Sequence, residues 1–113
     1  MIKTAGDDFK LLVIIVEKKI TRKVIKACKK AGAEGDTVIR GRGTGLHDPG
    51  SIFGVKVERE KSIILILVPD TYADSVLDAA TNTAKLNEPG TGIAFMLNSK
   101  SICGVSHLLK HYS

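Results

Sequence analysis

Two short runs of branched apolar residues limit most strongly the folds that this chain can adopt. Residues 11–16 (LLVIIV) and 63–68 (IILILV) contain no polar side chain, and each run is shorter than a typical buried helix. A short, uninterrupted run rich in β-branched residues predicts a strand that is buried on both faces. We therefore predict strands over residues 9–17 and 62–68, both in the interior of one sheet.

A segment with helical periodicity follows each of these strands. After the first strand, apolar residues recur at helical spacing between lysines and arginines. This pattern predicts an amphipathic helix over residues 20–32, with Gly32 at its C-terminal end. After the second apolar strand, Thr71 and Asp74 have the spacing of a capping box. The alanine-rich stripe that follows predicts a helix over residues 72–86.

The remaining segments complete the order of elements. Residues 36–42 and 93–97 have the composition of strands. From residue 52, apolar and polar residues alternate, which is typical of an extended hairpin arm. Residues 101–109 are apolar enough for a final element, whose type the sequence does not determine. The order β-α-β-β-α-β is that of the split βαβ fold. We predict an α+β, ferredoxin-like single domain over residues 1–113, with an antiparallel four-stranded sheet and two helices on one face.

This fold leaves one face of the predicted sheet without a cover. Two helices cover only one face, whereas the two central strands are apolar on both faces. Self-association into a symmetric oligomer is the simplest way to bury the second face.

The composition agrees with one small domain. With 113 residues and 43% hydrophobic content the chain can form one core, and with only 4% aromatic residues it has few rings on which bases could stack. The N-terminus lacks the basic and apolar segments of a signal peptide, so a cytoplasmic location is expected. Cys28 and Cys103 belong to no metal-binding or redox motif, and we interpret both as small core residues.

The net charge of +5 is accompanied by a concentration of lysine and arginine between residues 18 and 30. Lysines that face phosphates bind nucleic acids through counterion release, so this basic stretch raises a nucleic-acid hypothesis. The same residues lie on the polar side of the predicted helix, where a solvated charged face is the ordinary arrangement. We therefore do not expect nucleic acid as a partner.

A glycine-rich turn after the second predicted strand is the first candidate binding site. The site consists of Arg40, Gly41, Arg42, Gly43, Thr44 and Gly45. Glycines let backbone N–H groups approach an anion closely, and an arginine can donate two hydrogen bonds to a phosphate or carboxylate. The alternatives are a flexible hairpin loop and charges that protect a sheet edge from aggregation.

A second glycine turn connects the second predicted helix to the last strand of the sheet. It consists of Gly90, Thr91 and Gly92. Taken alone, this turn is typical of a simple helix-to-strand connection in which a glycine ends the helix. Two such turns in one small domain, each next to an edge strand, favour ligand binding.

His47 and Asp48, together with His107 and His111, are the candidates for a metal site or an acid–base site. No third ligand and no nucleophile has a matching spacing, so a polar loop tip is the better interpretation. We predict no catalytic residue, no metal site and a protein that is not an enzyme.

These residues resemble one known family. Residues 62–97 contain an apolar strand, Pro69 followed by Asp70, an alanine-rich helix, a Gly-x-Gly turn and a strand with Phe95. They resemble the second half of the nitrogen-regulatory P-II proteins. Upstream, the sequence Gly-Arg-Gly at residues 41–43 is similar to the Gly-x-Gly that enters the long mobile loop of that family. The resemblance covers most of the chain.

The resemblance implies a compact homotrimer that transmits a signal to other proteins. It implies an adenine nucleotide, usually ATP or ADP, in clefts between subunits, and a loop that docks onto a membrane transporter or an enzyme. By position, Gly41 and Gly43 match one wall of the cleft, and residues 90–92 match the other. We expect ATP, ADP, AMP or another small anion there, with signalling through the loop at residues 43–58.

Several charged residues of the family are replaced in this chain. The lysine that follows the second glycine turn and grips phosphate is matched by Ile93, and two arginines of the C-terminal segment are matched by Gly104 and Ser106. The glutamine that helps to hold a metal and 2-oxoglutarate aligns with Thr44 or Gly45. Backbone amides and the two arginines of the first turn are the groups that remain for an anion.

An alternative keeps the fold and changes the ligand. In this alternative the chain is a metal-responsive trimer, similar to the divalent-cation-tolerance proteins, that uses His47 with Asp48 or His107. Copper or zinc binding that is lost in His47→Ala is expected for this alternative.

Overall fold

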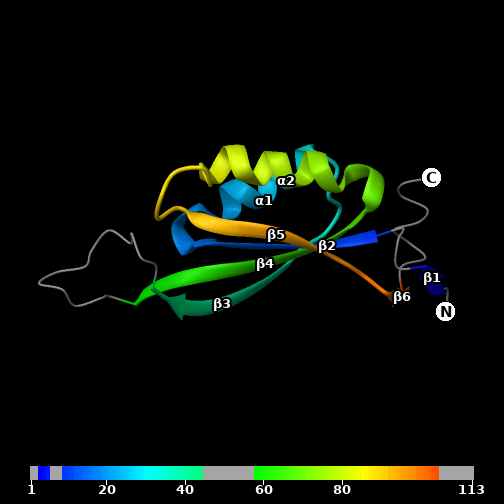
Figure 1. The fold of residues 1–113 in the computed structure, drawn as a ribbon. Helices are drawn as coiled ribbons and strands as arrows, with labels where there is room; N and C mark the ends of the chain where they lie inside the picture. The colour runs from blue at the N-terminus through cyan, green and yellow to red at the C-terminus, as the bar shows by residue number, and fades with distance from the viewer. Residues whose placement is uncertain (1–2, 6–8, 45–57, 105–113) are drawn as a thin grey trace, which may run out of the picture.

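The computed structural model describes residues 3–5, 9–44 and 58–104, and every structural statement below concerns these residues. The elements are β1 (Lys3–Ala5), β2 (Phe9–Glu17), the short 3₁₀ helix η2 (Lys18–Ile20), α1 (Thr21–Lys30), β3 (Thr37–Gly43), β4 (Arg59–Pro69), α2 (Asp70–Ala84), β5 (Gly92–Asn98) and β6 (Ser101–Cys103). Figure 1 shows the two long helices lying over one face of the sheet.

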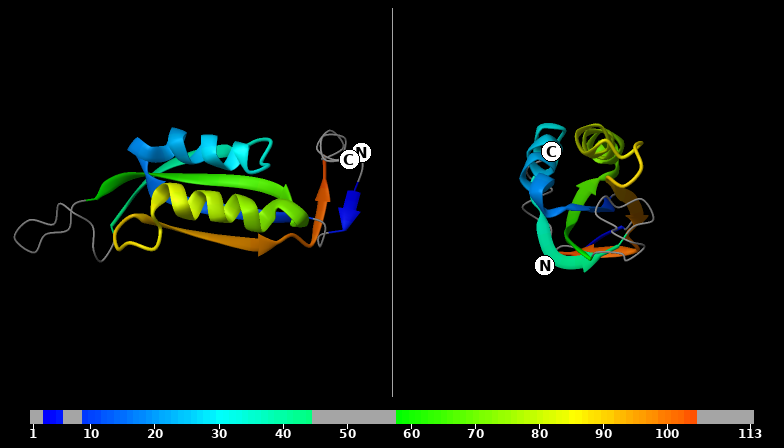
Figure 2. Two further views of the ribbon diagram at one scale, coloured as in Figure 1. Left: turned by 90° about the horizontal axis from the view of Figure 1, so that it is seen from above. Right: turned by 90° about the vertical axis from the view of Figure 1, so that its left-hand side faces the viewer.

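The main sheet has four antiparallel strands in the order β3-β4-β2-β5. The helices α1 and α2 lie side by side on the same face of this sheet (Figure 2). The two strands with continuous apolar runs, β2 and β4, are the central ones. The predicted α+β, ferredoxin-like fold is therefore confirmed.

The beginning of α2 differs from the prediction. The helix begins at Asp70, directly after Pro69, and no side chain caps its first turn. The predicted capping box of Thr71 and Asp74 is therefore wrong. Pro69 has an extended backbone, with φ −58° and ψ 146°, so the chain enters the helix without such a cap, and the Asp70 carboxylate in the first turn complements the helix dipole.

The end of α1 agrees with the prediction. Gly32 follows the last residues of the helix with a φ of +125°, a conformation that favours glycine. A Cβ atom at Gly32 would lie 2.5 Å from Cδ1 of Tyr72, so the Tyr72 ring on α2 packs directly on this glycine. The absence of a side chain at Gly32 therefore permits both the positive φ of the turn and the close packing of Tyr72 between the two helices.

The core lies between the helices and the sheet. Every second residue of the central strands enters it, together with small residues of α2 that allow a close approach, and its members include Leu12, Ile14, Val16, Val24, Cys28, Ile64, Ile66, Val68, Ala73, Val76 and Ala80. Burial, with a smaller contribution from Asp36, raises the pKa of the Cys28 thiol to about 11. Cys28 is thus a core residue as predicted, whereas the same prediction for Cys103 is wrong because that residue is exposed.

A small second sheet joins distant parts of the chain. Strands β1 and β6 pair in antiparallel fashion, with Lys3 opposite Cys103. The sequence predicted neither β1 nor the type of the final element. Ile102 of β6 packs with Phe9 and Leu67, which belong to the two central strands. None of the helices in the described ranges is long and apolar enough to cross a membrane.

Candidate functional site

The first glycine turn begins inside an edge strand rather than in a loop. Gly41 and Gly43 belong to β3 and pair with Lys61 and Arg59 of β4. A Cβ atom at Gly41 would have 4.0 Å to its nearest neighbour, and one at Gly43 would have 3.6 Å. The strand geometry therefore does not require glycine at either position. Thr44 is exposed at the end of the described segment, and Gly45 lies outside it.

The second glycine turn is shaped by its own hydrogen bonds. The Thr91 hydroxyl lies 2.9 Å from the carbonyl oxygens of both Lys85 and Glu88. Gly90 has a φ of +77° and Gly92 a φ of +144°. The helix ends at Lys85, which takes the left-handed conformation with φ 55° and ψ 47°. The alternative in which a glycine of this turn ends the helix is therefore wrong.

Gly92 is also pressed against the neighbouring strand. A Cβ atom at this position would lie 2.5 Å from the carbonyl oxygen of Ile15 and 3.0 Å from Cγ1 of Val16. Packing and backbone conformation together require glycine here. This structural role explains Gly92 without any ligand.

The two glycine turns lie at the same end of the sheet but at opposite edges. Gly92 of β5 is opposite Val16 of β2, which is opposite Ser62 of β4, which in turn is opposite Arg40 of β3. Three strand spacings of about 4.8 Å separate the two edges. One chain therefore does not bring the two turns together, and each lines a cavity of its own.

The cavity at the second turn contains cations that the sequence interpretation did not assign to it. It has a volume of about 460 Å³, and its lining includes Lys19, Lys23, Lys85, Gly90 and Thr91. The lysines come from η2, from α1 and from the end of α2. Two of them belong to the basic stretch that the sequence assigned to a solvated helix face. Only the packing of α1 beside the end of α2 reveals that they share a cavity.

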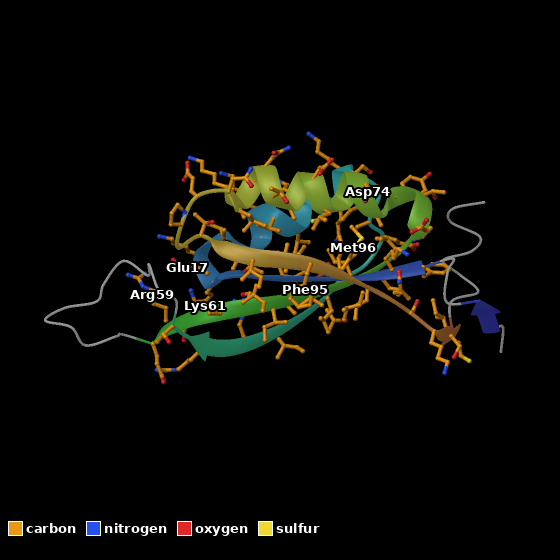
Figure 3. All side chains as sticks on the ribbon, in the orientation of Figure 1. Glu17, Arg59, Lys61, Asp74, Phe95 and Met96 are labelled. Carbon is orange, nitrogen blue, oxygen red and sulfur yellow. The ribbon has the colours of Figure 1, made fainter. Side chains whose placement is uncertain are left out.

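The first turn borders a larger basic groove at the end of the sheet next to η2. Two cavities, of about 690 and 270 Å³, share Lys18, Arg40 and Glu60 in their linings. Among the residues that the structure describes, the combined lining contains six cations and two carboxylates, namely Lys18, Lys19, Arg22, Arg40, Arg42, Arg59, Glu17 and Glu60. We call this set the basic groove. Figure 3 shows Glu17 and Arg59 at the same end of the sheet.

A chain of hydrogen bonds anchors Arg40 in this groove. Its Nη1 donates to Oγ of Ser62 at 2.6 Å, and that oxygen lies 2.5 Å from Oγ1 of Thr21. Thr21 Oγ1 is 2.8 Å from the carbonyl oxygen of Lys18. A carbonyl only accepts, so the Thr21 hydroxyl donates to Lys18 and the Ser62 hydroxyl donates to Thr21. Both hydroxyl residues are buried.

The sheet face opposite the helices is apolar. Its side chains form rows across the strands, and the rows consist of Ile39, Ile63, Ile15 and Ile93, of Leu65, Val13 and Phe95, and of Leu67, Leu11 and Leu97. We call these residues the open face. Ile93 is 54% exposed and Phe95 is 39% exposed, although both are large and apolar. The sequence predicted this uncovered face.

Several candidates lie outside the described residues. These are His47, Asp48, His107, His111 and Ser106, together with most of the loop at residues 43–58 and the hairpin arm expected from residue 52. Within the described ranges, no three His, Cys, Asp or Glu side chains come together as a metal site would require.

Comparison with known proteins links this geometry to one family. The family model of nitrogen regulatory protein P-II matches residues 9–105 of the chain. A crystal structure of Arabidopsis thaliana PII bound to citrate is 27% identical in sequence, with a TM-score of 0.64, and the match covers 82% of this chain and 78% of that chain. No curated protein sequence matches the chain.

Proposed function

The chain belongs to the P-II family of nitrogen regulatory proteins, and we propose that it is a non-enzymatic regulator that forms a homotrimer and senses a small anion between its subunits. In this proposal residues 1–113 are a single domain that acts in the cytoplasm. The single observation that carries the proposal is the placement of two glycine turns at opposite edges of one end of the sheet.

A cyclic oligomer makes one site from the two turns. In a head-to-tail ring, one surface of each chain meets a different surface of the next. The turn that contains Gly41 and Gly43 can then face Gly90 and Thr91 of a neighbouring copy. The open face supports the same assembly, because large apolar patches on a protein surface are typical of interaction sites.

The charges around the two turns favour a small anionic ligand. Arg40 and Arg42 line the cavity at the first turn, and Lys85 lines the cavity at the second turn. Ile93, which stands in place of the family's phosphate-gripping lysine, is exposed and supplies no charge. We propose ATP, ADP, AMP or another small anion as the effector. Occupancy would be transmitted to a membrane transporter or an enzyme through the loop at residues 43–58.

Two measurements test this function. Sedimentation equilibrium of the full chain is expected to give three times the monomer mass of 12.1 kDa. Calorimetric titration with ATP, ADP, AMP and bicarbonate is expected to show saturable binding of at least one of them, weakened in Arg42→Ala. Lys26→Ala, which removes a cation from the exposed face of α1 outside the cavities, is the control and is expected to bind as the wild type does. A monomer, or the absence of binding to all four compounds, would contradict the proposal.

A further inference from the structure

The basic groove has the size and the lining of a binding site within a single chain. Its larger part has a volume of about 690 Å³, which lies in the usual range of small-molecule sites, roughly 300–1,000 Å³. The lining comes from η2, α1, β2, β3 and β4, so elements distant in sequence form it. The cavity at residues 90 and 91 adjoins it, because Glu17 and Lys19 line both, whereas Arg22, Arg40 and Arg42 line only the groove.

The carboxylates of the groove neutralise only part of its positive charge. Glu17 lies 3.6 Å from Lys19 and 3.5 Å from Arg59, and Glu60 lies 3.2 Å from Lys18. The other three cations of the lining, Arg22, Arg40 and Arg42, form no ion pair in the described part of the chain. Arg22 and Arg40 line the larger cavity, and Arg40 and Arg42 line the smaller one that adjoins it. Guanidinium groups so placed repel one another, and an anion between them would relieve this repulsion.

Arg40 is held in place at the junction of the two cavities. Its anchor, Ser62, is fully buried in a strand whose other inward residues are Ile64, Ile66 and Val68. A polar group in such a position is costly to bury unless its hydrogen bonds are satisfied. The bonds to Arg40 and Thr21 satisfy it and restrict the guanidinium. A restricted side chain loses less conformational entropy when a ligand binds, so this anchor favours binding.

We propose that the basic groove is a second anion site, complete within one chain, which takes a small anion of about three negative charges through Arg22, Arg40 and Arg42. Phosphate and carboxylate groups both match the paired N–H donors of a guanidinium group, and such bidentate contacts are among the stronger hydrogen bonds in proteins. Arg40 and Arg42 also border the proposed cleft between subunits. Arg22 of α1 belongs to the groove alone.

Calorimetric titration of the full chain with inorganic pyrophosphate and with citrate, at physiological salt, tests this site. We expect one saturable event per chain for at least one of the two anions, and the difference between them identifies phosphate or carboxylate as the preferred group. Arg22→Glu is expected to weaken binding by about tenfold or more. Glutamate in the first turn of α1 is compatible with the helix dipole, so the variant should fold, and circular dichroism checks this.

Lys26→Glu is the matched control. It makes the same change of charge on the same helix, at an exposed residue that does not line the groove. Binding within about twofold of the wild type is expected. Equal losses in the two variants would mean that diffuse charge, rather than a site, holds the anion, and no binding of either anion would also overturn the proposal.

The same variant separates this site from the proposed cleft. Nucleotide binding that survives in Arg22→Glu while pyrophosphate or citrate binding is lost supports two distinct sites. If no nucleotide binds to the wild type but pyrophosphate or citrate binding depends on Arg22, the nucleotide function fails and the groove stands.

Discussion

Arg40 on the edge strand β3 donates a hydrogen bond of 2.6 Å to the hydroxyl of Ser62, which is fully buried in the central strand β4. The contact connects the surface at the first glycine turn with the interior of the sheet. Because Ser62 also contacts Thr21, the same polar chain links β3 and β4 to the beginning of α1. Side-chain hydrogen bonds therefore connect the edge strand to the helix layer.

Replacing Ser62 with alanine is expected to lower the free energy of unfolding by about 1–3 kcal/mol, because the substitution leaves buried polar partners unsatisfied. Urea denaturation of the wild type and of Ser62→Ala measures the change. Ser101→Ala, at an exposed position on β6, is the control and should stay within about 0.5 kcal/mol of the wild type. Equal stability of Ser62→Ala and the wild type would argue against a structural role for the hydrogen-bond chain.

Two glycines that looked alike in the sequence should respond differently to alanine. Gly92→Ala forces a side chain into positive φ and places its Cβ 2.5 Å from the Ile15 carbonyl oxygen, so a loss of stability of at least about 1–3 kcal/mol is expected. Gly41→Ala has room for the methyl group and should be close to wild-type stability. Thermal unfolding of both variants measures this, and an equal loss in the two would contradict the difference in their surroundings.

The open face should control assembly. Phe95 lies opposite Val13 in the middle of this face, and Phe95→Asp is expected to convert the proposed trimer into monomers by placing a charge in the interface. Asn82→Asp is the control, because it adds a charge at an exposed position of α2, in the helix layer. Sedimentation velocity distinguishes the outcomes, and a Phe95→Asp variant that assembles like the wild type would exclude this face as the interface.

The two cysteines should differ in reactivity with a thiol reagent. Cys103 is exposed and should react with Ellman's reagent within seconds to minutes at pH 8. Burial raises the pKa of Cys28 to about 11, so its thiol is protonated and shielded at this pH and should react only after unfolding. Mass spectrometry of the labelled peptides identifies the site, and fast labelling of Cys28 in the folded protein would contradict the burial.

The same pKa predicts how stability depends on pH. Since the folded pKa of Cys28 is about 11 and the ordinary value is 9.0, the unfolded chain releases this proton first. The contribution of the Cys28 thiol to the free energy of unfolding is therefore fully present below about pH 9. Between the unfolded and folded pKa values, the free energy of unfolding falls by up to about 1.4 kcal/mol per pH unit. Urea denaturation at pH 8 and 10.5 should show a smaller loss of stability in Cys28→Ala than in the wild type, and equal losses would refute this contribution.

Local sequence pattern was sufficient to predict most of the helices and strands. The strand β2 begins and ends where its apolar run predicts, and β4 contains the other run. Chain direction and the alternation of helices and strands then leave few topologies, since connections in split βαβ units follow general rules. The beginning of α2 was misplaced because its first turn carries no side-chain cap, so the capping pattern at Thr71 and Asp74 had no structural counterpart.

Local sequence pattern predicted only part of the candidate site. The glycines and arginines of the first turn were found from their composition, and the structure places Arg40 and Arg42 in one cavity. Two of the three lysines at the second turn, Lys19 and Lys23, were assigned to a solvated face, because a periodic charge pattern on one helix contains no information about the element packed beside it. The pairing of β1 with β6 was missed for a related reason, since neither strand is longer than three residues.

The sequence by itself determined the fold, the central strands and the apolar open face, because these follow from periodicities that extend over only a few residues. Tertiary structure alone decided which side chains share the basic groove, why Gly92 must be glycine, and that one chain keeps its two glycine turns at opposite edges. The bond between Arg40 and Ser62 spans 22 positions and that between Thr21 and Ser62 spans 41. Contacts over such separations depend on strand register and helix packing, which no local pattern encodes.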